Sequence, residues 1–277
     1  MPSLAINLCG LSFLPRAPSE YFAKLTKRIV NRRRHSIITK LTNSVSATRE
    51  DLLHSLMEAT YKKRKLTEKQ IADNGVLFFI AGSDTSSVTL SNCSWYLAQY
   101  PDFQAKLTAA IDKAITCDQD ITYDNLNRIE LLEAVINETL RLSPTVSRTT
   151  RVASRDCKLD DVHVSKGTTV WISNYVIMRS SENFENPDEF LPERWLDGHY
   201  GLRHNNQAFI AFAPGPRNCI GQRFAMFEMK LFLVRMLREF EFVKCDQTET
   251  KLSFYAGQQV MGAKSVTLTV VARNNNQ

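Results

Sequence analysis

The stretch FAPGPRNCIG, residues 212–221, decides the fold, because it places a cysteine in a glycine- and proline-rich loop directly before a long helix-like run. Unpaired backbone N–H groups and the helix dipole at such a position favour the thiolate form of Cys219. A thiolate there is either a nucleophile or a metal ligand. No histidine stands next to it in sequence to activate a nucleophile, although a partner distant in the sequence stays open. A single cysteine cannot hold zinc, so the pattern favours a cofactor that already carries its metal.

Length and composition describe a globular chain with a core. The 277 residues are 43% apolar and 23% charged, which excludes disordered and collagen-like chains. The 35 Lys and Arg against 29 Asp and Glu give a net charge of +6, a mild excess that predicts no nucleic-acid partner. The longest apolar run, residues 75–82, is far shorter than the roughly 20 residues of a bilayer crossing. No CxxC pair occurs, which argues against a zinc knuckle or disulfide scaffold among Cys9, Cys93, Cys117, Cys157, Cys219 and Cys245.

The hydrophobic pattern predicts a mainly helical chain with small β-sheets. Residues 1–18 are expected to form a surface or membrane-facing segment. Beyond them the pattern predicts helices at about 19–34, 49–61, 67–100, 102–116, 124–128, 131–143 and 220–239, and strands at 162–164, 168–172, 241–244 and 266–272. The helix over 67–100 starts with a capping box at Thr67 and would be ~50 Å long. Its middle, residues 76–81, is apolar on all sides and is expected to be buried.

The cysteine loop resembles the signature of the cytochrome P450 family, F-x-x-G-x-R-x-C-x-G. All five fixed positions are met, by Phe212, Gly215, Arg217, Cys219 and Gly221. At about one in twenty for each position, the expected number of chance matches in this length is on the order of 10⁻⁴. The signature is therefore specific.

Three further stretches agree with the family in order and spacing. Residues 81–86, AGSDTS, resemble its oxygen-binding segment, and residues 192–195, PERW, resemble its P-E-R-F/W stretch. Glu138 and Arg141 match its E-x-x-R. The last pair alone carries no weight, since about 0.7 such pairs arise by chance in this length. The resemblance covers nearly the whole chain and is closest in character to animal microsomal members.

The resemblance implies heme b as the cofactor, with the Cys219 thiolate as axial ligand of the iron. Gly215 and Gly221 would allow a tight loop close to the porphyrin, and Phe212 would shield the sulfur. Arg217 would pair with a heme propionate, and the family position matched by Arg148 implies the same role there.

On the opposite side of the heme, Ala81 and Gly82 would leave a groove for O₂, and Asp84 and Thr85 would relay protons to it. The alternative for this segment is a helix kink with a polar residue pointing inward. Substrate contacts by resemblance would come from Ile80, Ala81, Thr145, Val146 and residues 253–257.

Glu138 and Arg141 stand at i and i+3 on one helix, and with Arg194 they would form a buried charge network that locks the cysteine loop. Removing one partner would leave an uncompensated charge, at a cost of roughly 3–5 kcal/mol.

The resemblance also implies a function. The chain corresponds to the C-terminal portion of a family member, a single incomplete domain with its heme-binding loop at 205–223, and the N-terminal half and membrane anchor are expected to be absent. A family member inserts one atom of O₂ into an apolar xenobiotic, steroid or fatty acid, with electrons from NADPH–cytochrome P450 reductase, at the cytosolic face of the endoplasmic reticulum membrane. Two alternatives stay open: a heme-thiolate isomerase acting on a peroxide, and a truncated, non-catalytic protein.

Overall fold

The computed structural model describes residues 16–43, 51–61, 63–196, 206–255 and 260–273. The chain forms two compact units, residues 1–83 and 84–277, and the boundary falls inside a single long helix, α4 (Glu68–Gln99). Most of the segment expected at 1–18 lies outside the described residues. Among the described residues, none of the helices combines the length and the apolar character that a membrane span needs.

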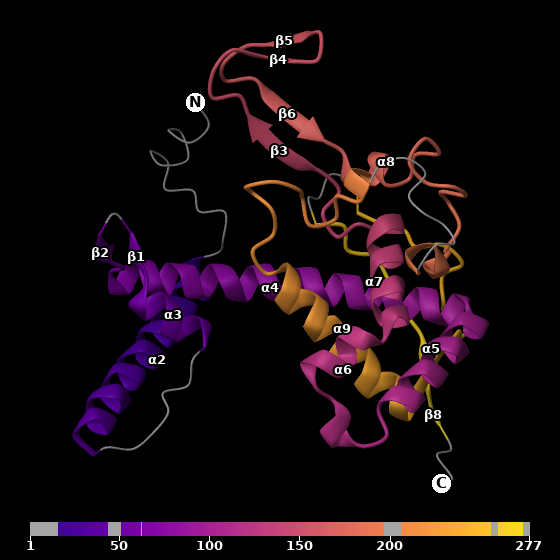
Figure 1. Cartoon of the computed structure of the whole chain (residues 1–277), viewed down its shortest axis with the longest axis horizontal. Coiled ribbons are helices and arrows are strands. Elements are labelled where there is room, and N and C mark those ends of the chain that lie inside the picture. Colours follow the sequence, from indigo (N-terminus) through magenta and orange to yellow (C-terminus); the bar gives the residue numbers. More distant parts are fainter. Residues whose placement is uncertain (1–15, 44–50, 62, 197–205, 256–259, 274–277) are drawn as a thin grey trace. The chain divides into compact units, whose positions relative to one another are not determined.

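In the part of the first unit that the structure describes, two helices and a short hairpin precede the start of α4 (Figure 1). Helix α2 (Arg16–Asn43) extends well beyond the predicted 19–34. Helix α3 (Leu52–Glu58) is shorter than the predicted 49–61, because β1 (Thr60–Tyr61) and β2 (Arg64–Lys65) pair immediately after it. A small core joins these elements through Val30, Met57 and Ile71.

Helix α4 begins at the predicted capping box. The backbone N–H of Gln70 donates to Thr67 Oγ1 over 3.2 Å, and the backbone N–H of Thr67 donates to Gln70 Oε1 over 2.9 Å. Two N–H groups at the start of the helix are thereby paired, as a capping box requires.

The predicted burial of residues 76–81 is wrong for this chain. The side chains of Leu77 and Phe79 are 62% and 57% exposed, and Ala81 is exposed. Phe79 packs against Phe22 of α2, with ring centroids 4.8 Å apart, but keeps most of its surface open. A helix that is apolar on all sides can be buried completely only when other parts of the protein pack against each of its sides.

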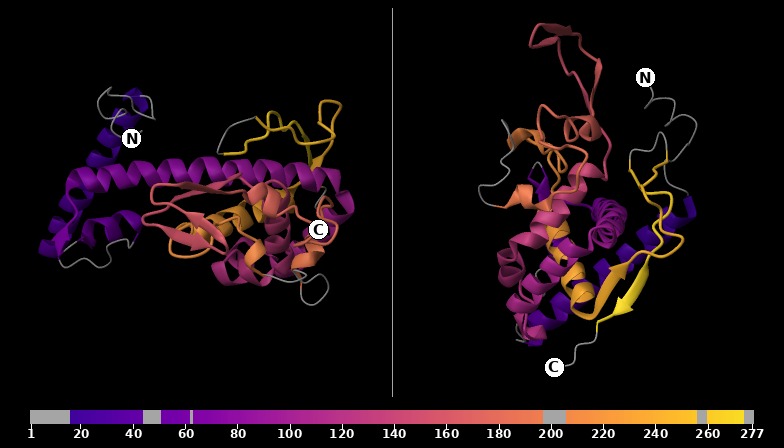
Figure 2. Two further views of the ribbon diagram at one scale, coloured as in Figure 1. Left: turned by 90° about the horizontal axis from the view of Figure 1, so that it is seen from above. Right: turned by 90° about the vertical axis from the view of Figure 1, so that its right-hand side faces the viewer.

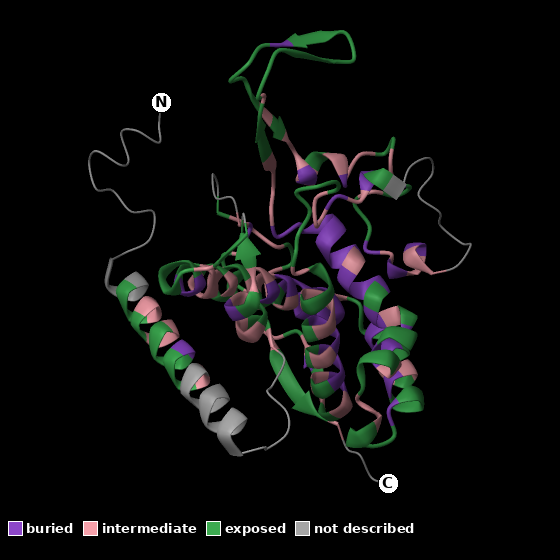
Figure 3. Cartoon of the chain, turned by 60° about the vertical axis from the view of Figure 1, so that its left-hand side comes forward, coloured by how far each residue is buried: buried purple, intermediate pink, exposed green. Residues whose placement is uncertain are grey.

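The second unit is built on a helical core. The core is formed by the C-terminal part of α4 together with α5 (Pro101–Ala114), α6 (Tyr123–Arg128), α7 (Glu130–Leu142) and α9 (Gln222–Glu239). Buried residues are concentrated on α7 (Figure 3), where Leu132, Val135 and Ile136 pack into the main apolar cluster with Leu233 and Leu237 of α9. This packing fixes α7 beside α9, the helix that directly follows the cysteine loop in the sequence.

Among its described residues, three antiparallel strand pairs complete this unit. They join β3 (Thr149–Val152) to β6 (Thr169–Ile172), β4 (Cys157–Leu159) to β5 (Val162–Val164), and β7 (Phe240–Val243) to β8 (Thr269–Ala272). The β4–β5 hairpin continues beyond the β3–β6 ribbon in Figure 1, and Figure 2 shows β7–β8 following the C-terminal end of α9. The predicted strands at 162–164 and 168–172 are present as β5 and β6. They do not pair with each other, because β5 pairs with β4 and β6 pairs with β3. The expected class, mainly helical with small sheets, is confirmed.

Short elements carry the chain between these pairs. Helix α8 (Asn174–Ile177) follows β6, and three 3₁₀ turns, η1 (Asp118–Asp120), η2 (Pro192–Trp195) and η3 (Asn206–Ala208), lie in the connecting segments. The η2 turn coincides with the PERW stretch and packs on α7.

Candidate functional site

A cavity of about 240 Å³ lies within the second unit, and the cysteine loop forms one of its walls. The other walls come from α4, from the end of α7 and the segment after it, and from α9. Its lining residues are Thr85, Ser86, Thr89, Leu140, Thr145, Val146, Thr149, Ala211, Phe212, Ala213, Arg217, Cys219, Ala225 and Met229. Segments far apart in the sequence therefore meet around Cys219.

The cysteine loop closes on itself through backbone hydrogen bonds. The N–H of Cys219 donates to the carbonyl of Phe212 over 2.8 Å, and the N–H of Asn218 donates to the carbonyl of Gly215 over 3.0 Å. Gly215 has a φ of 85°, a conformation that glycine adopts without strain. Ala213 has a φ of 54°, which is uncommon for a residue with a Cβ atom. The loop thus holds a defined, partly strained shape around the exposed thiol of Cys219.

The thiol also stands at the start of α9. Gly221 is the N-cap residue, its carbonyl accepts from the N–H of Ala225 over 2.8 Å, and no side chain caps the helix. A Cβ atom added at Gly221 would lie 4.0 Å from Cys219 Sγ. This is an ordinary van der Waals distance, so a small side chain at position 221 would touch the sulfur without displacing it.

Hydroxyl groups line the α4 wall of the cavity. Thr89 Oγ1 donates to the Thr85 carbonyl over 2.9 Å and lies 2.7 Å from Thr145 Oγ1. Because a hydroxyl carries one proton, Thr145 must be the donor to Thr89. Ser86 is only 6% exposed, and its Oγ has no hydrogen-bond partner among the described residues. An unpaired buried hydroxyl is costly, so Ser86 is available to a polar group of a bound ligand.

The four residues predicted to form the O₂ groove and the proton relay differ in whether they line the cavity. Thr85 lines the cavity, whereas the exposed side chain of Asp84 does not. The Asp84 carbonyl accepts from Ser87 Oγ over 3.0 Å. Ala81 and Gly82 belong to the first unit, where a Cβ added at Gly82 would meet nothing within 4 Å.

The two arginines predicted to bind propionates also differ. Arg217 is exposed and lines the cavity with Cys219. Arg148 lines a second cavity, of about 290 Å³, together with Tyr175 and Tyr255. Its guanidinium carbon lies 4.7 Å from the ring centroid of Trp171, a cation–π contact.

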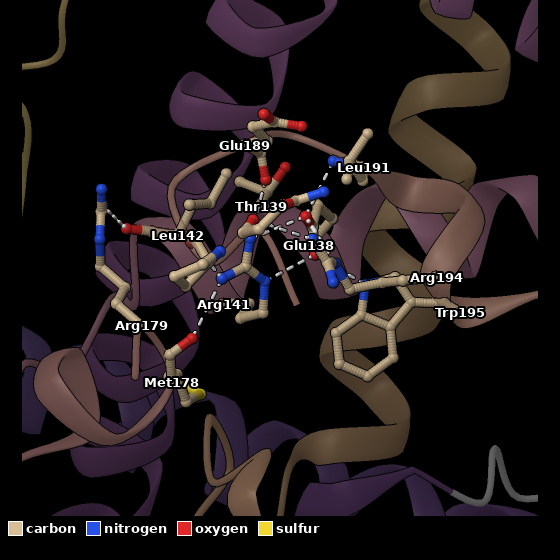
Figure 4. A network of polar contacts seen from close by, with 12 residues as sticks. Glu138, Thr139, Arg141, Leu142, Met178, Arg179, Glu189, Leu191, Arg194 and Trp195 are labelled. Carbon is tan, nitrogen blue, oxygen red and sulfur yellow. Dashed lines mark hydrogen bonds and ion pairs between the residues drawn. The ribbon is translucent and has the colours of Figure 1, made fainter. Parts of the chain in front are cut away.

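The predicted charge network is present and buried (Figure 4). Arg141 bonds Glu138 with two nitrogens, both over 2.8 Å, and Arg194 Nε donates to Glu138 Oε1 over 3.1 Å. The other N–H groups of these two guanidinium groups donate to backbone carbonyls, those of Arg141 to Met178, Pro187 and Glu189 and those of Arg194 to Glu185 and Asn186. Within the described residues, no hydrogen bond joins Glu138, Arg141 or Arg194 to residues 212–221. The network therefore fastens the segment 178–194 to α7 directly.

Sequence reasoning missed Trp195 as part of this network. Its indole Nε1 donates to Glu138 Oε2 over 3.0 Å, and its ring meets the ring of Phe209. The PERW stretch marked the position, but an aromatic residue there predicts packing, and no local pattern indicates that its indole N–H reaches a buried carboxylate.

The donor set fits a metal that brings other ligands of its own. Across the described ranges, no group of three or more His, Cys, Asp or Glu side chains could hold an ion. Cys219 is a single thiol on a mostly apolar cavity wall, and such a wall suits a flat apolar macrocycle better than a bare ion. The buried Ser86 hydroxyl, which has no partner among the described residues, agrees with a bound group in this space.

Comparison with known proteins settles the family. The family model described as cytochrome P450 matches residues 16–270. This chain belongs to the cytochrome P450 family. It is 34% identical over 276 residues to cytochrome P450 3A16 of Mus musculus and 34% identical over 273 residues to cytochrome P450 3A29 of Sus scrofa. Cytochrome P450 3A14 of Cavia porcellus is 33% identical over 275 residues.

The cytochrome P450 chain spans about half the length of these curated relatives. Each alignment covers 97% of this chain and 52% of the relative. The signature loop, the E-x-x-R pair and the PERW stretch all lie within the matched residues 16–270.

Proposed function

We propose that this chain carries the heme-thiolate site of a cytochrome P450 monooxygenase, which inserts one oxygen atom of O₂ into an apolar small molecule. The observation that carries the proposal is the shared cavity: Cys219 lies on one wall and the hydroxyls of α4 lie on another. Family membership supports the same class of reaction.

Cys219 would hold the iron of heme b as its axial thiolate ligand. Once bound, the heme supplies O₂ binding and the oxidising chemistry. The loop supports this role for Cys219 because its backbone bonds leave the sulfur exposed toward the cavity. Arg217 stands on the same wall and would pair with a propionate, while Phe212 would limit access of water to the sulfur. Arg148 would pair with the second propionate, and to do so its guanidinium would have to leave its cation–π contact with the Trp171 ring.

Hydroxyl groups on α4 would deliver protons to the bound oxygen. Thr85 and Ser86 both line the cavity, and Ser86 Oγ is unpaired among the described residues. A hydroxyl in this position can orient a water molecule that carries a proton to bound oxygen. Asp84 is exposed beside them and would exchange protons with solvent, one step away from the cavity.

The substrate class, the electron donor and the location follow from the resemblance to microsomal animal members. We infer an apolar xenobiotic, steroid or fatty acid as substrate, NADPH–cytochrome P450 reductase as donor, and the cytosolic face of the endoplasmic reticulum membrane as location. The cavity supports an apolar substrate, since apolar side chains such as Leu140, Val146 and Met229 line much of it.

One experiment separates this function from its two rivals. The purified chain is mixed with heme, and NADPH-dependent oxidation of an apolar substrate is followed in the presence of the reductase. Heme uptake with NADPH-dependent product supports the proposal. Heme uptake with rearrangement of an added peroxide, and no NADPH-dependent product, would replace it with an isomerase. Failure to take up heme would assign the chain to a non-catalytic protein.

A further inference from the structure

We propose that Trp195 is a positioning residue, which connects the buried carboxylate of Glu138 to the loop that carries Cys219. Glu138, Arg141 and Arg194 have no direct hydrogen bond to residues 212–221 within the described part of the chain. A route from this network to the cysteine loop is therefore indirect, and Trp195 offers one, because it contacts Glu138 on one side and Phe209, three residues before the loop, on the other.

The first end of the route is the carboxylate itself. Glu138 Oε1 accepts three bonds, from Arg141 Nη2 at 2.8 Å, from the N–H of Leu191 at 2.9 Å and from Arg194 Nε at 3.1 Å. Oε2 accepts two bonds, from Arg141 Nε at 2.8 Å and from Trp195 Nε1 at 3.0 Å. Glu138 is fully buried, so each of these bonds is made in a medium where an unmade bond is costly.

The second end of the route is the ring of Trp195. Its centroid lies 4.7 Å from that of Phe209, with an interplanar angle of 62°, an edge-to-face contact. Phe209 packs against both apolar clusters that meet here: the one that contains Met178 and Phe184, and the main core. It therefore stands where the segment fastened by Glu138 meets the helical core.

Backbone bonds continue the route into the loop. The N–H of Ala213 donates to the carbonyl of Ile210 over 3.0 Å, which closes a turn directly after Phe209. The carbonyl of Phe212 then accepts from the N–H of Cys219 over 2.8 Å. A shift of Phe209 therefore acts on the turn that sets the Phe212 carbonyl, and through it on Cys219.

Tryptophan provides both contacts that this position makes, the N–H bond to Glu138 and the ring contact with Phe209. Phenylalanine would keep the edge-to-face contact but leave Glu138 Oε2 with one donor, whereas alanine would remove both contacts. The pair of substitutions W195F and W195A thus separates the hydrogen bond from the ring contact. The inference rests on the proposed function only in taking Cys219 as the heme ligand, because the route itself is a property of the chain without cofactor.

The test measures amide hydrogen exchange of the intact chain without heme, resolved by mass spectrometry for peptides that cover residues 209–221. We expect W195F to speed exchange at the Cys219 amide about tenfold, as loss of a bond to a charged group implies. We expect W195A to speed it further. Exchange in β7 (Phe240–Val243), in the same unit but off the route, should stay within experimental error in W195F. W171F is the matched control, since Trp171 is 66% exposed and should leave both regions unchanged.

The indole N–H groups provide a second readout that needs no variant to fold. With ¹⁵N-labelled tryptophan, the indole N–H of Trp195 should exchange with solvent far more slowly than that of the exposed Trp171. Trp95, whose indole donates to the carbonyl of Glu249 over 2.9 Å, gives the value for an ordinary backbone acceptor. Faster exchange throughout the chain in W195F, β7 included, would reduce Trp195 to a general stabilising residue and overturn the proposal. Unchanged exchange at Cys219 in both variants, or a Trp195 indole as fast as that of Trp171, would overturn it as well. None of these results depends on heme binding.

Discussion

The Oγ1 atoms of Thr89 and Thr145 lie 2.7 Å apart, and this buried hydrogen bond joins α4 to the segment that follows α7. The carbonyl of Thr145 also accepts from the N–H of Met261 over 2.7 Å, so one residue ties three parts of the chain together. Thr89 and Thr145 both line the cavity that Cys219 also lines. The wall is therefore fixed by polar contacts that the second unit makes within itself.

Thr145→Val should lower the free energy of unfolding by about 1–2 kcal/mol, because it removes the donor to the buried Thr89 hydroxyl. Urea denaturation followed by circular dichroism measures this change. Thr149→Val is the matched control, since Thr149 lines the same cavity and its side chain makes no hydrogen bond among the described residues. Equal effects of the two substitutions would show that the Thr89–Thr145 bond contributes nothing of its own.

Glu138→Gln should be much more damaging. The amide keeps the shape of the side chain but leaves the buried guanidinium groups of Arg141 and Arg194 without a counter-charge, at a cost of roughly 3–5 kcal/mol. Thermal unfolding would detect it as a large fall in Tm. Glu130→Gln, at an exposed position on the same helix, should leave Tm almost unchanged. A Tm for Glu138→Gln close to that of Glu130→Gln would contradict the role given to the network.

Cys93 should resist alkylation in the folded chain. Burial raises the pKa of its thiol to about 12, and a hydrogen bond with Thr139 lowers it only in part. At pH 8 about one such thiol in ten thousand is a thiolate, which is the reactive form. Iodoacetamide labelling with mass spectrometry should modify the exposed Cys117, Cys157 and Cys219 and leave Cys93 intact until the chain is unfolded. Labelling of Cys93 at the rate of Cys157 would show that α4 is not packed as described.

Asp120 should stabilise the fold only above acidic pH. Hydrogen bonds from the Thr116 hydroxyl and from the N–H groups of Cys117 and Thr116 lower the pKa of its carboxyl to about 2. A lowered pKa in the folded state means that the stabilisation is present above the ordinary value for aspartate and is lost as the pH falls toward 2. Asp120→Asn should therefore lower Tm at pH 7, and its difference from the unaltered chain should shrink between pH 4 and 2. A difference that does not vary with pH would contradict this.

Much of the fold could be predicted because local signals and tertiary packing agree. The capping box at Thr67 and the glycines of the cysteine loop act through neighbouring backbone atoms, so their effect is readable from the sequence. Helix α7 was predictable for a similar reason, since its apolar stripe is the face it buries against α9.

The rest depended on contacts that no local pattern specifies. The exposure of Leu77 and Phe79 reflects which partners the chain offers them, and their own residue type gives no information on this. The split between Thr85, in the cavity wall, and Asp84, outside it, depends on the rotation of α4 relative to the loop. The link from Trp195 to Glu138 spans 57 positions in sequence and required the structure.

The central claim is that Cys219 binds the heme iron, and the absorption spectrum of the reduced carbon monoxide complex tests it most directly. The heme-loaded chain should show the thiolate-type band, and Cys157→Ser, which alters an exposed thiol elsewhere, should keep it. Cys219→Ser should abolish it, because serine offers no thiolate to the iron. A thiolate-type band that persists in Cys219→Ser, or that is absent from the unaltered chain, would contradict the account.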